Sequence, residues 1–137
     1  LSDAACVDAL IVTNSLIHDC AYTAIQIPAA ADGKEKQSCS SFELTNSTIY
    51  NIGDNTKDYG AVDIRDNANI ASAQQVFIDH VTIYNFSTKP SYGGFMIYKS
   101  GNATISNCYI YGGRTNIFVD TGNVTIKNCK FILFSFC

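Results

Sequence analysis

A short motif recurs along the whole chain and limits what the chain can fold into. Its fullest copy is residues 44–52 (LTNSTIYNI), and looser copies occupy residues 12–19, 78–85, 105–112 and 126–132. Aligned on their third residue, the five copies share one position, which holds Asn14, Asn46, His80, Asn107 and Asn128. The steps between these residues are 32, 34, 27 and 21. Repeats at such periods indicate stacked units, none of which can bury its apolar face alone.

Each copy shows the alternation of a β-strand on either side of a bend. In the fullest copy the pattern points Leu44 and Ile49 inward and Thr45 outward. Helical spacing is not sustained anywhere, and loop-type residues separate the pieces. A second apolar-alternating piece follows each of the first four copies, at residues 24–27, 61–65, 94–98 and 116–120. We therefore expect an all-β solenoid in which Leu44 stacks over Val12 and Ile78 stacks over Leu44.

The shared third position falls at the bend between two strand pieces. Asn tolerates the left-handed backbone conformation that such a bend requires, and stacked Asn amides can bond to the copies above and below. We predict that these five residues form a buried structural ladder. His80 takes the place of Asn, and alternation points Asp79 away from it. We therefore expect backbone groups to satisfy His80, which would otherwise need a nearby carboxylate or nucleophile for catalysis.

The copies follow the pattern Ile-x-Asn-x-x-Ile and resemble those of right-handed parallel β-helix proteins of the pectate-lyase-like superfamily. The resemblance covers nearly the whole chain and implies a single domain, residues 1–137, of about four to five coils with an Asn ladder. That domain is expected to be complete, a piece of a longer solenoid, or one subunit of a stacked assembly. For lyases and hydrolases of this family, the resemblance implies a groove beside the sheet of the second strand pieces. Acidic residues there bind calcium or act as acids, and Arg or Lys acts as base.

Five residues of this chain match such a site, namely Asp63, Arg65, Tyr98, Lys99 and Asp120. A lyase needs a base near an α-proton and a group that neutralises the substrate carboxylate. Asp63 and Arg65 stand two positions apart on one strand, where a surface ion pair is the simpler interpretation. No cluster of three carboxylates appears. We therefore expect no catalytic residue, no cofactor and no metal site, and calcium enters only with the lyase hypothesis.

Tyr50, Tyr84 and Tyr111 share one outward register with His18. Stacked in a column, they would present flat faces to sugar rings or to a partner protein. Ordinary strand propensity and cross-strand aromatic pairing explain the same pattern without a ligand.

Composition limits the cellular compartment and the classes of binding partner that we expect. The chain carries 9 basic and 12 acidic residues without a basic stripe, so nucleic acid is not an expected partner. No apolar run approaches the roughly 20 residues that span a bilayer. Because the sequence begins at Leu1 rather than Met, we expect that any signal peptide has been removed. Six cysteines without a CxxC pair favour disulfides over zinc, and hence an extracellular location.

Four of the cysteines suggest bridges between neighbouring coils. Cys108 and Cys129 directly follow the ladder residue in successive copies, so they could form a disulfide or stack as free thiols in the core. Cys6 and Cys39 stand eight and seven residues before the ladder Asn of the first two copies, which suggests a second bridge.

Glycosylation is expected on the outside of the solenoid. Sequons of the form N-x-S/T begin at Asn46, Asn85, Asn102 and Asn123. Because Asn46 belongs to a ladder that we expect to be buried, we predict glycans at the other three only.

The ends of the solenoid suggest a function. Natural solenoids need polar caps, and no capping helix is apparent. Open ends would stack head to tail, and the remaining cysteines, Cys20 and Cys137, would link neighbouring molecules. We therefore predict an extracellular, non-catalytic structural or adhesive module that self-associates through its coil ends, with a filament as one form of the assembly. The alternative is a polysaccharide-active lyase or hydrolase, or a carbohydrate-binding domain.

Overall fold

The computed structural model describes residues 7–27, 39–53, 60–64, 75–86, 93–113 and 115–133 of the 137-residue chain. Within these ranges every regular element is a β-strand, and every pairing between strands is parallel. The strands are β1 Val7–Thr13, β2 Leu16–Cys20, β3 Ile25–Ile27, β4 Cys39–Ile52, β5 Val62–Ile64, β6 Gln75–Phe86, β7 Gly93–Ser106, β8 Tyr109–Gly113, β9 Thr115–Lys127 and β10 Lys130–Leu133.

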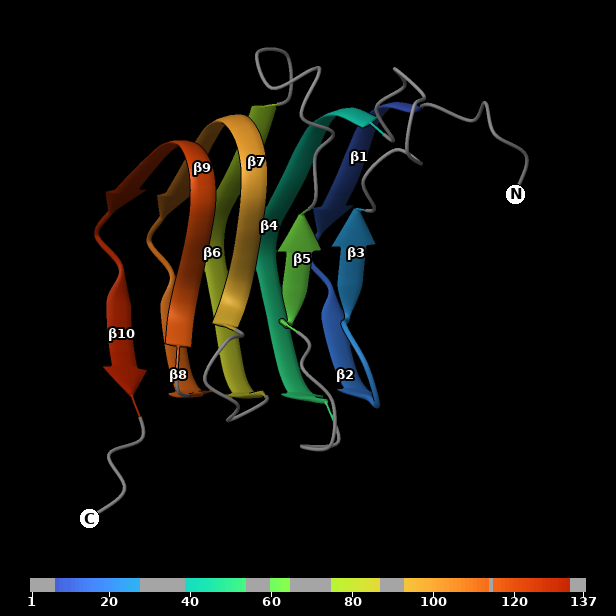
Figure 1. Ribbon diagram of the computed structural model, residues 1–137. Coiled ribbons are helices and arrows are strands. Elements are labelled where there is room, and N and C mark those ends of the chain that lie inside the picture. The colour runs from blue at the N-terminus through green and yellow to red at the C-terminus, as the bar shows by residue number, and fades with distance from the viewer. Residues whose placement is uncertain are drawn as a thin grey trace.

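The ten strands wind into successive coils with three faces (Figure 1). The first sheet joins β1, the N-terminal parts of β4 and β6, and the C-terminal parts of β7 and β9. The second sheet joins β2, the C-terminal parts of β4 and β6, β8 and β10. The third sheet joins β3, β5 and the N-terminal parts of β7 and β9. The described residues therefore form four coils with all three strands and a fifth coil with its first two.

The first sheet has the register that the motif predicts. Leu44 pairs with Val12 on one side and with Ile78 on the other, and the same column continues through Ile105 to Ile126. Leu44, Ile78 and Ile105 are 0% exposed. Burial of one such side chain stabilises the fold by roughly 1.5–3 kcal/mol, so the stacking of like residues gives the coils a continuous core.

The ladder position is a bend, as predicted, but the ladder is not buried. All five of its residues have φ between 48° and 52°, the left-handed region that Asn adopts more readily than most residues. All five side chains are exposed, which corrects the prediction. The bend is a convex corner of the coil, so its side chains point away from the core. Asn128 Nδ2 donates to Asn107 Oδ1 at 3.4 Å, the one ladder contact between two amides among the described residues.

A second bend, which the sequence analysis does not foresee, follows five residues after the first in four coils. Its residues are again in the left-handed region, with φ of 56° at Asp19, 55° at Asn51, 51° at Asn85 and 92° at Gly112. Asn85 Nδ2 donates to Asn51 Oδ1 at 2.6 Å, and Asn51 Nδ2 donates to Asp19 Oδ1 at 2.8 Å. Through the first three coils this outer row therefore forms the hydrogen-bonded ladder that was expected at the first bend, and it ends at Gly112, which has no side chain.

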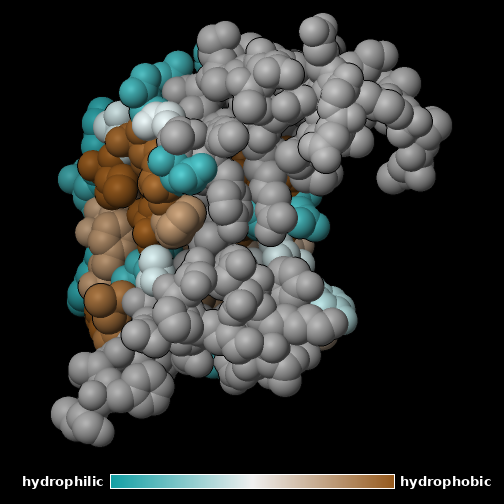
Figure 2. Space-filling view, in the orientation of Figure 1, coloured by the Kyte–Doolittle hydropathy of each residue, from teal (hydrophilic) through white to brown (hydrophobic). Residues whose placement is uncertain are grey.

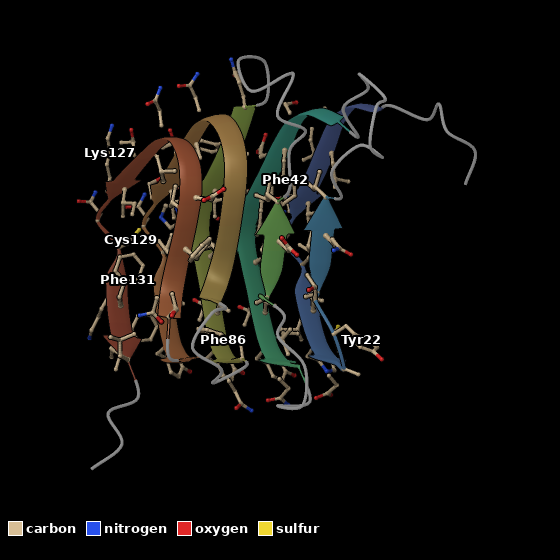
Figure 3. All side chains as sticks on the ribbon, in the orientation of Figure 1. Tyr22, Phe42, Phe86, Lys127, Cys129 and Phe131 are labelled. Atoms are coloured by element: carbon tan, nitrogen blue, oxygen red, sulfur yellow. The ribbon has the colours of Figure 1, made fainter. Side chains whose placement is uncertain are left out.

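Phe86 fills the corner after the second bend (Figure 3). Gly113 makes room for its ring, and Gly94 makes room for Ile110. Phe86 is 2% exposed. A Cβ atom on Gly113 would overlap the Phe86 ring, and one on Gly94 would lie 2.8 Å from Ile110 Cγ2 and 3.6 Å from Phe86 Cζ. The absence of side chains at these two positions is thus a packing requirement.

Candidate functional site

Asp63, the first of the five candidate lyase residues, lies where the register predicts but not at the surface. In the third sheet it pairs with Gln26 of β3 and Met96 of β7. Asp63 is only 1% exposed, which contradicts its predicted place at the surface, whereas the predicted pairing with Arg65 stays a prediction. Its burial also removes it from an open groove on that sheet.

The other four candidates do not form a described cluster with Asp63. The column of Asp63 continues to Phe118 on β9, two strands away. Asp120 lies two residues beyond Phe118 and is exposed. Arg65 lies outside the described residues. Tyr98 and Lys99 belong to β7, and their side chains lie outside the described part. Among the described residues, no three His, Cys, Asp or Glu side chains come together as a metal site.

The predicted aromatic column is present on the outer face of the second sheet. The ring centroids of His18 and Tyr50 are 4.9 Å apart, those of Tyr50 and Tyr84 are 4.9 Å apart, and those of Tyr84 and Tyr111 are 5.2 Å apart. The angles between the ring planes are 9°, 2° and 7°. Both faces of Tyr50 and Tyr84 are therefore covered by neighbouring rings. The column offers ring edges and hydroxyl groups to a ligand, so the expectation of open flat faces is wrong for these two rings.

A cation lies beside the end of the column. The Tyr109 ring lies 4.8 Å from the Tyr111 ring with a tilt of 37°. Lys130 Nζ lies 5.4 Å from the centroid of Tyr109, within the range of a cation–π interaction. The outer face of the second sheet thus carries aromatic rings from β2 to β8, and β10 adds Lys130 and the exposed Ile132.

A polar cluster around Asp79 joins the third and fourth coils. Asp79 Oδ1 accepts hydrogen bonds from Ser106 Oγ at 2.6 Å and from Asn107 Nδ2 at 2.8 Å. Asp79 Oδ2 lies 2.6 Å from His80 Nδ1. These bonds, that from Ser106 foremost, lower the pKa of Asp79 to about 2. The register that pairs Asp79 with Ser106 could have revealed the cluster.

The contact between Asp79 and His80 corrects the prediction that Asp79 points away from the histidine. His80 is the left-handed bend residue, so the strand alternation is broken at that position. His18 and Asp19 form the same kind of pair at 2.7 Å, and there Asp19 is the bend residue. Ser106 donates to the carboxylate and not to the imidazole, so the cluster does not have the geometry of an activated serine nucleophile.

The described cysteines are free thiols. Cys108 is buried, and Cys20 and Cys129 are partly buried. The predicted disulfide between Cys108 and Cys129 is not formed, and the two occupy the alternative arrangement of stacked thiols. Cys108 Sγ lies 3.0 Å from the carbonyl oxygen of Ser106, and Cys129 Sγ lies 3.2 Å from that of Lys127. Cys6 and Cys137 lie outside the described residues, and so does the side chain of Cys39. The bonds predicted for these three cysteines stay predictions.

Of the four sequon asparagines, only Asn46 has a different exposure from the one expected. Asn46 is exposed, so burial does not protect it from glycosylation. Asn85 is exposed as well, but its amide nitrogen donates to Asn51 in the second ladder. Asn102 and Asn123 are exposed and directly paired on neighbouring strands, in the common register that the sequence predicts.

The fifth coil leaves inward-facing residues uncovered. Ile126, Phe131 and Leu133 are 46%, 40% and 58% exposed. Figure 2 shows hydrophobic surface at the end of the molecule where Figure 1 places β9 and β10. Figure 3 places Phe131 on β10 at this end. The sequence analysis foresees open ends but not which of these residues remain exposed.

Stacked parallel strands, a repeated left-handed bend and a continuous apolar interior define the class of protein as a parallel β-solenoid. The family of the right-handed β-helix region matches residues 35–135, and the chain belongs to this family. A search of curated proteins and a search of solved structures each returned no match. The described residues contain no helix with the length and hydropathy of a membrane span.

Proposed function

We propose that this protein is an extracellular, non-catalytic structural or adhesive module that associates with further copies of itself through the ends of its coils. The observation that carries the proposal is a contrast between equivalent positions. Ile126 is 46% exposed, whereas its partner Ile105 is 0% exposed. Phe131 is 40% exposed, whereas its partner Ile110 is 0% exposed. One more coil would bury both residues in the way that the fifth coil covers Ile105 and Ile110 of the fourth.

The first coil of a second copy has the residues that such a coil needs. Val12 and Ile17 face the core and are only partly buried. In a head-to-tail stack they would continue the columns that end at Ile126 and Phe131. Within the described residues, β9 pairs with β7 and β10 pairs with β8, and neither has a strand on its other edge. Such edges pair readily with strands of another chain, and a heterologous contact that does not close grows into a filament.

Two phenylalanine variants test the proposal. Phe131→Asp places a charge at the open end, and Phe77→Asp is the matched control, because Phe77 is 45% exposed on the outer face of β6. Light scattering coupled to size exclusion and negative-stain microscopy should show assembly for wild type and for Phe77→Asp, but monomers for Phe131→Asp. Circular dichroism checks that both variants are folded. A wild type that stays monomeric at its highest soluble concentration contradicts the proposal.

A carbohydrate-binding role is the second candidate, and the aromatic column is the observation that favours it. Tyr50, Tyr84 and Tyr111 share one register on neighbouring strands. Their hydroxyl groups make no hydrogen bond to another described residue. A row of hydroxyl groups can bond to the hydroxyls of an extended glycan. A polysaccharide array compares wild type with Tyr84→Phe, which keeps the ring and removes the hydroxyl group. Equal binding by both proteins, or no binding, argues against this candidate.

A further inference from the structure

The open end of the fifth coil has a notch where a third strand would complete the coil. A cavity of about 400 Å³ lies there, and it is lined by Thr115, Asn116, Ile117, Ile126, Phe131 and Leu133. The first three residues belong to β9 in the third sheet, and the other three are the uncovered inward residues of the first two sheets. The notch therefore has a backbone edge on one side and apolar side chains on the others.

The preceding coils show which residues suit this position. In the third sheet, Ile25 of β3 pairs with Val62, then Phe95, then Ile117. A parallel column runs from Ile27 through Ile64 and Ile97 to Val119. Each strand thus has two apolar residues separated by one other residue. A fifth strand would place the same pattern over Ile117 and Val119, which is itself 39% exposed.

Asn116 supplies a polar group that points to a missing partner. It is 7% exposed, and its Oδ1 is buried without a hydrogen-bond partner in the structure. A buried amide oxygen without a donor is costly, and most such groups are paired. If the Asn116 side chain turns toward the notch, a backbone or side-chain N–H from an added strand satisfies it. The apolar lining explains why a strand would bind here, and Asn116 favours one that also brings a donor.

We propose that the notch binds an extended segment of a second polypeptide, parallel to β9, with two apolar side chains at alternating positions. This inference rests on the proposed function, because both need the same end of the solenoid to be open. The segment adds backbone hydrogen bonds to the edge of β9 and places its apolar side chains against Phe131 and Leu133. Such strand addition takes affinity from the backbone and specificity from alternate side chains.

A peptide copied from the chain's own third strand provides the probe. We choose the fluorescein-labelled peptide of residues 22–27 (YTAIQI), and its control carries Ser in place of Ile25 and Ile27. Fluorescence anisotropy should show saturable binding of the first peptide and not of the second. Asn116→Leu should weaken binding about tenfold, as expected for one lost hydrogen bond in a buried site. Leu133→Asp should abolish binding, and Phe77→Asp should leave it unchanged.

The outcomes separate this inference from the proposed function. Peptide binding by a protein that never assembles supports the notch and contradicts head-to-tail assembly. Assembly of a protein that ignores the peptide overturns the notch and leaves the proposed function in place. Equal affinity of the Ile and Ser peptides, or of wild type and Leu133→Asp, also overturns the notch. Circular dichroism of each variant ensures that lost binding is not lost folding.

Discussion

His80 Nδ1 lies 2.6 Å from Oδ2 of Asp79, although the two residues are neighbours on one β-strand. Strand alternation would send their side chains to opposite faces. The φ of 52° at His80 breaks that alternation and brings both side chains to the same side. The 2.7 Å contact between His18 and Asp19 has the same origin, with the left-handed residue now being the aspartate. The bends therefore create pairs of adjacent polar side chains as well as corners.

Asp79 should make the stability of the protein sensitive to acid. Its pKa in the folded protein is about 2, below the ordinary value of 3.8, chiefly because Ser106 donates a hydrogen bond to the carboxylate. The stabilisation is complete above about pH 4 and is lost as the pH falls through about 2. Asp79→Asn should lower the free energy of unfolding by about 1–2 kcal/mol at pH 7. Urea denaturation from pH 7 to pH 2 measures the difference from wild type, which should shrink toward pH 2.

The control for this experiment is Asp120→Asn, because Asp120 is exposed on β9. That substitution should leave the free energy of unfolding nearly unchanged at every pH. A difference between wild type and Asp79→Asn that stays constant down to pH 2 would show that the effect is not due to the ionised carboxylate.

Tyr84 should be the most important residue of the aromatic column, because it has stacked partners on both sides. Its ring centroid lies 4.9 Å from that of Tyr50 and 5.2 Å from that of Tyr111. Since an aromatic pair contributes about 0.5–1.5 kcal/mol, Tyr84→Ala should cost about 1–3 kcal/mol. Chemical denaturation measures this cost, and Thr82→Ala on the same outer face is the control. A double-mutant cycle of Tyr50→Ala and Tyr84→Ala with no coupling energy would contradict stacking as the cause.

Gly113→Ala should destabilise the protein because the new methyl group would overlap the ring of Phe86. Overpacking of this kind costs about 1–3 kcal/mol. Thermal unfolding of Gly113→Ala, Phe86→Leu and the double variant tests the cause. If the clash is responsible, Phe86→Leu will cost less in the Gly113→Ala background than in wild type. Simple addition of the two effects would assign the loss to something other than this contact.

The thiol of Cys108 should react far more slowly than the other described thiols. Burial raises the pKa of Cys108 to about 12, so almost none of it is the reactive thiolate near neutral pH. Cys20 and Cys129 are more exposed. Isotope-coded iodoacetamide and mass spectrometry should show at least about tenfold slower labelling of Cys108 in the folded protein. Equal labelling in urea is the control, and equal labelling in the folded protein would contradict the burial of Cys108.

The column positions could be predicted because one aligned residue fixes the register of a whole strand. Leu44, Tyr50 and Cys108 all follow from the alignment of the motif copies. The alternation rule fails at the bends, which is why the Asp79–His80 contact and the exposure of Asn46 were missed. The second bend was also readable, since Asp19, Asn51, Asn85 and Gly112 recur at one place in the motif. The burial of Asp63 depends on packing outside its own strand, and strand periodicity carries no information about that packing.

The two bends are five residues apart in each of the first four coils, from Asn14 to Asp19 and from Asn107 to Gly112. The steps from one coil to the next vary from 34 down to 21 residues. The second sheet is therefore a strip of constant width, and all differences in chain length fall between the second bend of one coil and the first bend of the next. A segment inserted in that stretch would leave the strip unchanged, whereas one added or deleted residue between the two bends of a coil would misalign every column on it. The solenoid thus combines one face that cannot vary in length with a remainder of each coil that can.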